Sequence, residues 1–398
     1  MLLVVMVFIG CEYGIAENGQ EYNSHVEQYD PEEVEQQLEQ YDPEDEEEHV
    51  EQYDPEDENE KQDEDPPLVG LRGFAVAPDD HGYLAVRWIE HMNDYLPNRL
   101  PYSDRELETA EWVVETFLEM GFDASQIEMQ TFGLDTPTSS WWGSSVLSVE
   151  WFEEMGYYDG LERIDFSQNV ILTIPGRSEE TIIIGAHYDG LAYPGVSDNA
   201  SGTVLLLESA YRMRNVDHYY TLQYVFFGAE EVGLDGAFYF VDNMTQEEID
   251  NLILMINADV IMDGSDLIYA VGYIDELPHF PRDILWGGLS DIPQNPLSEQ
   301  VKEIAVQLNA EHGTDLISKP RGITLASDHL AFVQFEIPVV VFYATQPPHY
   351  PDIFDGDVLH TERDCLDFIV ANHPGRVERT LYEFGLFLEE VLSSEFIQ

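Results

Sequence analysis

Apolar residues along the chain gather into short continuous runs, and longer stretches with a helical period lie between and after these runs. The runs are bounded by turn residues, which predicts buried strands at residues 168–174, 181–184, 223–227, 252–256 and 338–343. The longer stretches place apolar residues every three or four positions, which predicts helices over residues 103–120, 201–214, 236–243 and 375–393. The first of these helices has its own boundary signals, because Ser103 and Glu106 match a capping box and Gly121 ends it.

Short apolar strands that alternate with helices are typical of α/β proteins. We therefore expect one domain with a central mixed, mostly parallel β-sheet that is flanked by helices on both faces. Sites in such sheets lie at the carboxyl ends of the strands. Functional side chains are thus expected directly after the predicted strands.

The N-terminal region has a different character. Met1–Gly10 is an unbroken apolar run, which is too short to span a bilayer but typical of an export signal. Phe8-Ile9-Gly10-Cys11 resembles a bacterial lipobox, so we expect residues 1–11 to be an export signal with lipidation at Cys11. The protein would then be exported, as a cell-surface lipoprotein or a secreted protein. No lysine or arginine precedes the run, and a chance apolar start is the alternative.

An acidic repeat follows. The sequence EQYDPE begins at Glu27, Glu39 and Glu51, a spacing of 12 residues. Such a short repeat with proline cannot bury a core, and its like charges extend the chain. Residues 12–67 are therefore predicted to be a disordered acidic spacer, with a calcium-binding or adhesive repeat as the alternative. Residues 68–398 are expected to form the folded domain.

Composition and charge exclude some partners. The 398 residues include 80 acidic and 16 basic ones, a formal net charge of −64. Residues 1–67 contain 24 of the acids and one base, so they carry −23, and the remaining residues carry −41. This excess argues against nucleic acid and anionic lipid surfaces, because both need clustered Lys and Arg. The two cysteines, Cys11 and Cys365, predict no disulfide within the folded domain.

Histidines and carboxylates follow the predicted strands as one set: His187, Asp189, Asp198, Glu230, Glu231, Asp259 and His360. Any one of them alone would usually be a helix cap or a surface group. Two adjacent glutamates after an apolar strand, however, are costly unless a positive charge lies beside them. Imidazole together with carboxylate favours zinc, so the set predicts a zinc site.

The same residues suffice for two ions. His187 and Asp259 would hold one zinc ion, Glu231 and His360 would hold the other, and Asp198 would bridge them. Three ligand carboxylates and a bridging hydroxide balance the charge of two Zn²⁺.

Two further carboxylates remain for other roles. Glu230 would act as a general base beside metal-bound water. Asp189 would accept the second ring N–H of His187 or of a neighbouring imidazole, which orients a metal-bound histidine.

The motifs GAHYD, SDNASG, FGAEEVGLDGA, NADV and HTERD resemble those of the di-zinc aminopeptidase family that includes bacterial leucyl aminopeptidases and aminopeptidase Y. The resemblance spans about Tyr102–Leu392. It implies a single α/β catalytic domain, two zinc ions and the release of N-terminal residues from peptides. It also implies Glu230 as the catalytic base and the zinc ligands His187, Asp198, Glu231, Asp259 and His360.

The segment Ser327-Asp328-His329 is similar to a family segment that lies near the substrate. Adjacent residues cannot form a serine triad, whose members come from separate loops, so we expect this segment to shape the substrate pocket. Some family members carry a tyrosine shortly before it, which is missing here, and Tyr343 is a candidate to replace it. Thr361 and Asp364 match a capping box.

Other functions stay open. A glutaminyl cyclase resembles this family but uses one zinc ion, and a carboxypeptidase would need a basic group such as Arg321 or Arg363 for the substrate's C-terminus. A non-catalytic surface protein that only binds is a third alternative. No obligate protein partner is evident from the sequence, and peptides are the expected substrates.

Overall fold

The computed structural model describes residues 73–134, 136, 148–191, 193–263, 296–316, 327–333, 335, 337–344 and 358–394. The chain divides into two units between Pro66 and Pro67, and all of the described residues belong to the second unit. The predicted signal, the spacer and Cys11 lie outside the described residues. Within the described part, no helix has both the length and the apolar character needed to cross a membrane.

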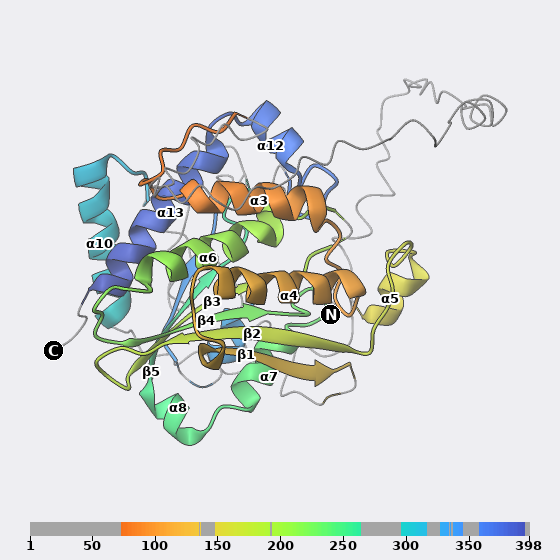
Figure 1. The fold of residues 1–398 in the computed structure, drawn as a ribbon, viewed down its shortest axis with the longest axis horizontal. Helices are drawn as coiled ribbons and strands as arrows, with labels where there is room; N and C mark the ends of the chain where they lie inside the picture. Colours follow the sequence, from red (N-terminus) through yellow and green to blue (C-terminus); the bar gives the residue numbers. More distant parts are fainter. Residues whose placement is uncertain are drawn as a thin grey trace, which may run out of the picture. The chain divides into compact units, whose positions relative to one another are not determined.

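The centre of the fold is a six-stranded mixed sheet (Figure 1) with strand order β1-β2-β4-β3-β5-β6. Its strands are β1 Ile127–Gly133, β2 Phe166–Ile174, β3 Thr181–His187, β4 Thr221–Phe227, β5 Leu252–Ala258 and β6 Val339–Phe342. β3 pairs in parallel with β4 and β5, and β5 pairs in parallel with β6. β2 runs antiparallel to both β1 and β4. The predicted mixed, mostly parallel sheet is confirmed.

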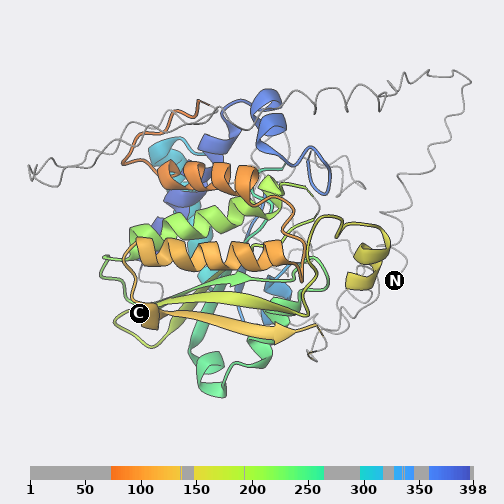
Figure 2. The ribbon, with the colours of Figure 1, turned by 45° about the vertical axis from the view of Figure 1, so that its right-hand side comes forward.

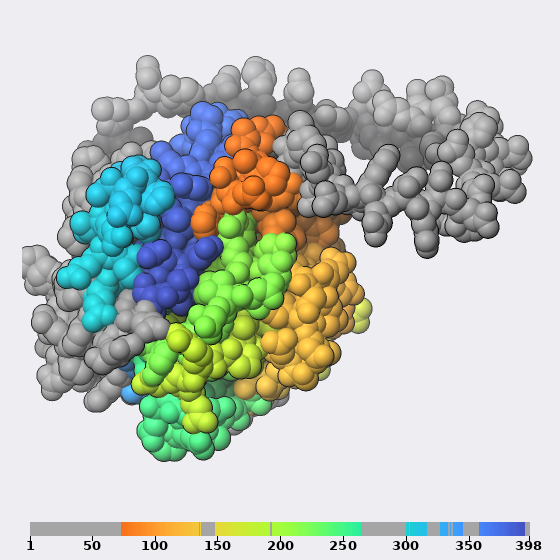
Figure 3. Space-filling view, turned by 60° about the vertical axis from the view of Figure 1, so that its left-hand side comes forward, coloured from red at the N-terminus to blue at the C-terminus, as the bar shows by residue number. Residues whose placement is uncertain are grey.

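Helices cover both faces of this sheet. One face carries α3 Tyr83–Tyr95, α4 Asp104–Glu119, α6 Ser201–Met213 and α13 Arg376–Ser393, with α10 Pro296–His312 and α12 Leu366–Asn372 beyond them. The opposite face carries α7 Asp235–Asp242, α8 Gln246–Asn251 and α11 His329–Val333. The short α5 Val149–Glu154 lies beside the sheet (Figure 2). In the space-filling view, α10, α13, α6 and α3 form adjacent bands over one side (Figure 3).

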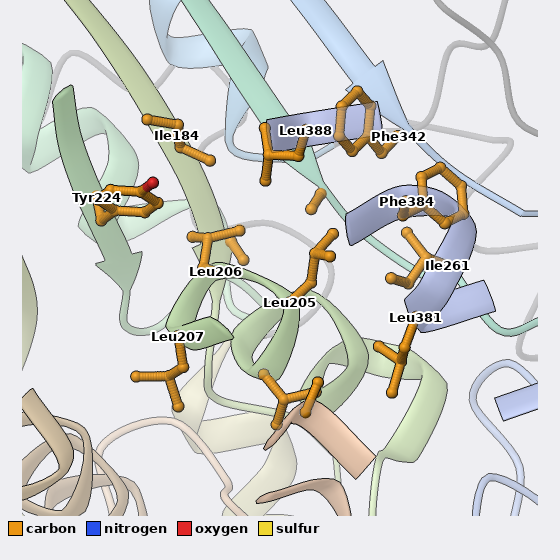
Figure 4. Close-up of a cluster of buried hydrophobic side chains, with 14 of the residues drawn as sticks. Ile184, Leu205, Leu206, Leu207, Tyr224, Ile261, Phe342, Leu381, Phe384 and Leu388 are labelled. Atoms are coloured by element: carbon orange, nitrogen blue, oxygen red, sulfur yellow. The ribbon is translucent and has the colours of Figure 1, made fainter. Parts of the chain in front are cut away.

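Alternation along the strands divides the core into two layers, since successive side chains of a strand point to opposite faces. Ile182 and Ile184 of β3 pack toward α6, whereas Ile183 packs toward α7 and α11. Figure 4 shows the larger layer, in which leucines of α6 meet β3, β4 and the side of α13 that carries Leu381, Phe384 and Leu388. Leu206 and Phe384 are fully buried there. Helix α6 is thus buried on nearly every side, because it is enclosed by the sheet and by α3 and α13.

One buried carboxylate joins α6 to α3. Glu208 accepts hydrogen bonds from the backbone N–H groups of Gly82 and Ala85, each at 2.8 Å, and from Arg212 Nε at 2.9 Å. These amides belong to the first turn of α3, whose N-terminal N–H groups have no partner within the helix. Glu208 therefore caps α3 from a residue more than 120 positions away.

All predicted strands and helices are found, with ends that differ by a few residues. Two predicted capping boxes are wrong in detail. Ser103 Oγ does accept the N–H of Glu106, but Glu106 accepts the N–H of Tyr102 and not that of Ser103. Thr361 and Asp364 begin no helix, because α12 starts only at Leu366 with Cys365 as its N-cap.

Candidate active site

The predicted residues meet at the carboxyl edge of the parallel strands. His187 is the last residue of β3, the pair Glu230-Glu231 follows β4, and Asp259 follows β5. Asp198 lies in the turn Val196–Ala200 that leads into α6, and it precedes a cis peptide bond. His360 reaches the same edge from the segment before α12. Parallel pairing explains this convergence, because it aligns the ends of β3, β4 and β5.

Two groups of three residues bring their nitrogen and oxygen atoms within 4.8 Å of one another, as an ion would require. His187, Glu230 and Asp259 form the first group, and Asp198, Glu231 and His360 form the second.

Asp198 joins the two groups. Its Oδ1 lies 3.2 Å from His187 Nε2, and its Oδ2 lies 3.0 Å from His360 Nε2. His187 Nε2 is also 3.2 Å from Asp259 Oδ1. One carboxylate therefore faces both imidazoles, each with a different oxygen.

The buried carboxylates of this edge have too little positive charge beside them. Burial, followed by the negative charge of Asp198, raises the pKa of Glu231 to about 8. Burial also raises the pKa of Glu230 well above its usual range, and the positive charge of His187 offsets only part of this effect. Glu231 Oε1 is buried and has no hydrogen-bond partner among the described residues. Such an arrangement is unfavourable for the protein alone and fits bound cations.

The imidazoles respond to the same charges. Burial opposes the charge on His360, but its hydrogen bond to Asp198 and the charge of Glu231 outweigh burial and raise its pKa to about 9. For His187, the charges of Glu230 and Asp259 likewise overcome burial, so its pKa is raised well above the usual value. The donor set of imidazole nitrogens and carboxylate oxygens suits zinc, which would displace these protons on binding.

Asp189 offers His187 two oxygen acceptors. His187 Nδ1 lies 3.2 Å from the backbone oxygen of Asp189 and 3.5 Å from its Oδ1. The carboxylate accepts the N–H groups of Glu230 and Glu231, each at 3.1 Å. The nearest acceptor for the imidazole is therefore the carbonyl, while the carboxylate fixes the backbone of the segment after β4.

The backbone at this edge is strained. Ala229, Val260 and His360 have left-handed φ values of 54°, 48° and 54°, which are unfavourable for residues with a Cβ and most unfavourable for β-branched valine. Each lies next to a predicted site residue or is one. Gly228 allows close packing, since a Cβ there would lie 2.4 Å from Ser167 Oγ. Outlying conformations of this kind concentrate at functional sites.

Sequence patterns gave no sign of Arg99, which is 1% exposed. Its guanidinium donates to the carbonyl oxygens of Tyr188 at 2.7 Å, Leu96 at 3.1 Å, Pro194 at 2.6 Å and Gly195 at 2.8 Å. Burial lowers its pKa to about 10, which still leaves it charged at neutral pH. Arg99 therefore holds the loop between His187 and Asp198 and places a positive charge beneath the acidic edge.

Asp364 also has a role that its capping-box pattern concealed. Its carboxylate accepts the N–H of Ser197 at 2.6 Å and the N–H of Asp198 at 3.0 Å. Burial raises the pKa of Asp364 to about 7. It thus ties the segment of His360 to the backbone that carries Asp198, across 166 positions of sequence.

The segment Ser327-Asp328-His329 lies at the start of α11 and is buried. Ser327 Oγ accepts a hydrogen bond of 2.7 Å from Asn257 Nδ2. Both carboxylate oxygens of Asp328 and the hydroxyl of Tyr343 are buried without a hydrogen-bond partner among the described residues. Burial lowers the pKa of His329 to about 4, so this imidazole is neutral at physiological pH.

Two basic groups were candidates for a carboxypeptidase activity. Arg321 lies outside the described residues, whereas Arg363 is exposed and stacks over the ring of Phe368 at 5.7 Å. Cys365 is half-buried at the start of α12 and forms no disulfide.

Comparison with known proteins places this arrangement in a family. Residues 169–385 match the model of "Peptidase family M28". Among curated proteins, aminopeptidase YwaD of Bacillus subtilis is 34% identical over 83 residues, 21% of this chain and 18% of that protein. The probable lipoprotein aminopeptidase LpqL of Mycobacterium tuberculosis is 34% identical over 98 residues, 24% of this chain and 20% of that protein. The chain spans about half, or less, of the length of the first curated relatives that it matches.

Solved structures show the same fold. The zinc aminopeptidase BSAP from Bacillus subtilis superposes with a TM-score of 0.57 at 16% identity, covering 78% of this chain and 96% of that one. A glutaminyl cyclase from an Acidobacteriales bacterium superposes with a TM-score of 0.56 at 18% identity, covering 80% of this chain and 98% of that one. At these identities the likeness concerns the fold alone. The family match covers more than half of the chain and includes nearly the whole candidate site, so the chain belongs to peptidase family M28.

Proposed function

We propose that this protein is a zinc-dependent aminopeptidase with two zinc ions and a glutamate general base. The observation that carries the proposal is the Asp198 carboxylate, whose two oxygens face the imidazoles of the two separate donor groups. Family membership and the names of the aminopeptidase relatives support the same activity.

Each ion would have its own ligands. His187 and Asp259 would hold one zinc ion, Glu231 and His360 would hold the other, and Asp198 would bridge them. Their mutual distances and the unpartnered Glu231 Oε1 support this assignment. When bound, zinc polarises a carbonyl group and lowers the pKa of water, which is the chemistry that amide hydrolysis requires.

Glu230 would act as the base. Its carboxylate would accept a proton from the attacking water and return it to the nitrogen of the leaving amine. Burial already raises the pKa of this carboxylate, which favours both accepting and holding a proton. Since Glu230 also lies within the first donor group, metal counting has to distinguish a base from a ligand.

The acidic surroundings would select the substrate's free α-amine. Asp328 is fully buried with both oxygens unpartnered among the described residues, and it lies close enough to His187 and Asp259 for their charges to affect its pKa. It is therefore a candidate for the ammonium group, together with the neighbouring Ser327 and His329. The buried hydroxyl of Tyr343 is a candidate donor to the substrate carbonyl.

The residues before the folded domain are proposed to export and tether it. Residues 1–11 would be an export signal with lipidation at Cys11, residues 12–67 an acidic spacer and residues 68–398 the catalytic domain. The lipoprotein name of LpqL supports the anchor. Incorporation of labelled palmitate into the native chain, but not into Cys11→Ala, would test it.

A glutaminyl cyclase activity is the second candidate, because a cyclase shares the fold. Such an enzyme would use one zinc ion, whereas two donor groups are present here. Elemental analysis of the purified protein separates the two candidates, since about two zinc ions per chain are expected for the aminopeptidase and one for the cyclase.

Hydrolysis of aminoacyl-p-nitroanilides, with and without a chelator, tests the activity. We expect chelator-sensitive release from the native protein. Glu230→Ala should abolish turnover while the zinc content stays near two per chain. A loss of one zinc ion in this variant would instead identify Glu230 as a ligand, and full activity would contradict its role as base.

A further inference from the structure

The turn Ala229-Glu230-Glu231 carries two residues of the candidate site, and its backbone conformation is not favoured locally. Ala229 has a φ of 54°, in the left-handed region that an alanine rarely adopts. Contacts from outside the turn must therefore hold it in place.

Three consecutive N–H groups of this turn are accepted by buried carboxylates. Glu106 Oε1 accepts from Ala229 at 2.8 Å, whereas Asp189 accepts from Glu230 and Glu231 with its two oxygens. Asp189 lies two residues after the end of the adjacent strand β3. Glu106 comes from the first turn of α4, 123 positions away, and belongs to neither donor group.

Glu106 is fully buried, and both of its oxygens are used. Oε2 accepts the N–H of Tyr102 at 2.6 Å, while Oε1 also accepts the hydroxyl of Ser167 at 2.7 Å. The carboxylate thus joins α4, β2 and the turn after β4. A buried carboxylate is stable only when its oxygens are satisfied in this way.

A second contact closes a ring around the turn. The hydroxyl of Tyr102 donates to Asp235 Oδ2 at 2.9 Å, and the N–H of Asp235 donates to the carbonyl oxygen of Ala229 at 3.1 Å. Both peptide groups of Ala229 are therefore fixed by the same unit, Glu106 with Tyr102 on one side and Asp235 on the other. A shift of the first turn of α4 must move Ala229 and the glutamates that follow it.

We propose that Glu106 is a positioning residue that sets the backbone of the Ala229–Glu231 turn and, through it, the orientation of the Glu230 and Glu231 carboxylates. The consequence for catalysis rests on the proposed function. The consequence for metal retention rests only on Glu231 as a ligand. Because ligand orientation depends on such supporting contacts, their loss typically costs 10- to 100-fold in activity or metal affinity.

Glu106→Gln is the sharpest variant. A glutamine has the same shape, but it offers one carbonyl oxygen where the carboxylate offers two. Whichever way its amide turns, an NH₂ group faces either the N–H of Tyr102 or the N–H of Ala229. The variant therefore disrupts the support of the turn without leaving a cavity.

Glu208→Gln is the matched control. Glu208 is also buried and also accepts two backbone N–H groups, and its partners Gly82, Ala85 and Arg212 are not candidate site residues. We expect both variants to lower the melting temperature by similar amounts. Only Glu106→Gln should lower kcat 10- to 100-fold, with KM changed less than about threefold, and release zinc at a roughly tenfold lower chelator concentration.

Two results would overturn the proposal: kcat and zinc retention within threefold of the native protein in Glu106→Gln, or equal losses in both variants. If Glu106→Gln does not fold, Tyr102→Phe tests the proposal in its place, because it removes only the hydroxyl contact to Asp235. This variant should also lower kcat and zinc retention, but by a smaller factor than Glu106→Gln. Values equal to those of the native protein would contradict the proposed role of the contacts around the turn. A native protein without peptidase activity would refute the proposed function, while zinc release would still test Glu106.

Discussion

The helix–sheet interface around α6 and the carboxyl edge of the same sheet are built on opposite principles. At the interface, Leu206 and Ile184 are fully buried among other apolar side chains. At the edge, a few residues further along the same strands, the buried groups are carboxylates and imidazoles on a backbone with left-handed residues. The interface is stabilised by exclusion of water from apolar surface, whereas the edge concentrates charge that its own residues do not balance.

This difference implies that the two regions have separate roles, which mutations can test. Changes at the interface should lower stability and leave the chemistry intact below the melting temperature. Changes at the edge should lower activity and metal binding with little effect on stability, because strained and unpaired groups contribute least to folding.

His360→Ala should have the largest effect on activity. The substitution removes a nitrogen donor that faces Asp198 at 3.0 Å and Glu231 at 3.7 Å. We expect kcat/KM to fall on the order of 10³-fold or more, which corresponds to about 4 kcal/mol, and the zinc content to fall from two toward one. His312→Ala, at an exposed position of α10, is the control. Two retained zinc ions would contradict the assignment of His360.

Leu206→Ala tests the other region. Leu206 is fully buried in α6 against the sheet, and removal of such a side chain typically costs about 2–5 kcal/mol of folding stability. Chemical denaturation should show this loss, while kcat measured well below the melting temperature should equal that of the native protein. A parallel fall in kcat would mean that the two regions are not separable.

The same division decides what could be predicted from sequence. Most strands and helices of the interface follow from short-range periodicity, and their predicted ranges are confirmed, but helix α3, which packs against α6, was not predicted. Elements with weaker patterns were missed, such as the antiparallel edge strand β1, whose residues are half-exposed or exposed except Phe132, and the short helix α8. Marginal burial gives little periodic signal to detect.

Residues that follow an apolar strand were likewise predictable, and His187, Asp198 and Glu231 do meet at the edge. Their supporting residues were not. Arg99 and Glu106 act through contacts that join segments about 90 and 123 positions apart. Nothing near these residues in sequence distinguishes them from an ordinary basic residue and an ordinary helix start, so only the three-dimensional fold identifies them.

Asp235→Asn measures the cost of a buried charge at the start of α7, beside the edge. Burial raises the pKa of Asp235 from its ordinary 3.8 to about 6. Between these values the folded protein holds a proton that the unfolded chain has released, so stability falls as the pH rises from about 4 to about 6. An asparagine can still accept from Tyr102, and it carries no charge. We therefore expect the variant to be more stable at pH 7 by up to about 3 kcal/mol, with no difference at pH 4.

Urea denaturation across this pH range measures the difference in free energy of unfolding. A difference that is constant with pH would show that the Asp235 carboxylate is not perturbed. Since Asp235→Asn keeps the contacts of the Ala229 turn, kcat should remain that of the native protein. The variant thus also separates the charge of Asp235 from its role as a hydrogen-bond acceptor.

Asp364→Asn should have the smallest effect, because it leaves every candidate ligand in place. Asp364 uses one oxygen for the N–H of Ser197 and the other for the N–H of Asp198, and an asparagine can accept only one of these. The backbone that carries Asp198 would shift, so we expect kcat and zinc affinity to fall 10- to 100-fold, about 1.4–2.7 kcal/mol. Glu362→Gln removes an exposed charge two residues away and should leave both quantities unchanged. If Asp364→Asn lowered only the melting temperature, Asp364 would contribute to stability, as Leu206 does, and not to the site. The boundary between the two regions would then lie closer to the site than the contacts of Asp364 indicate.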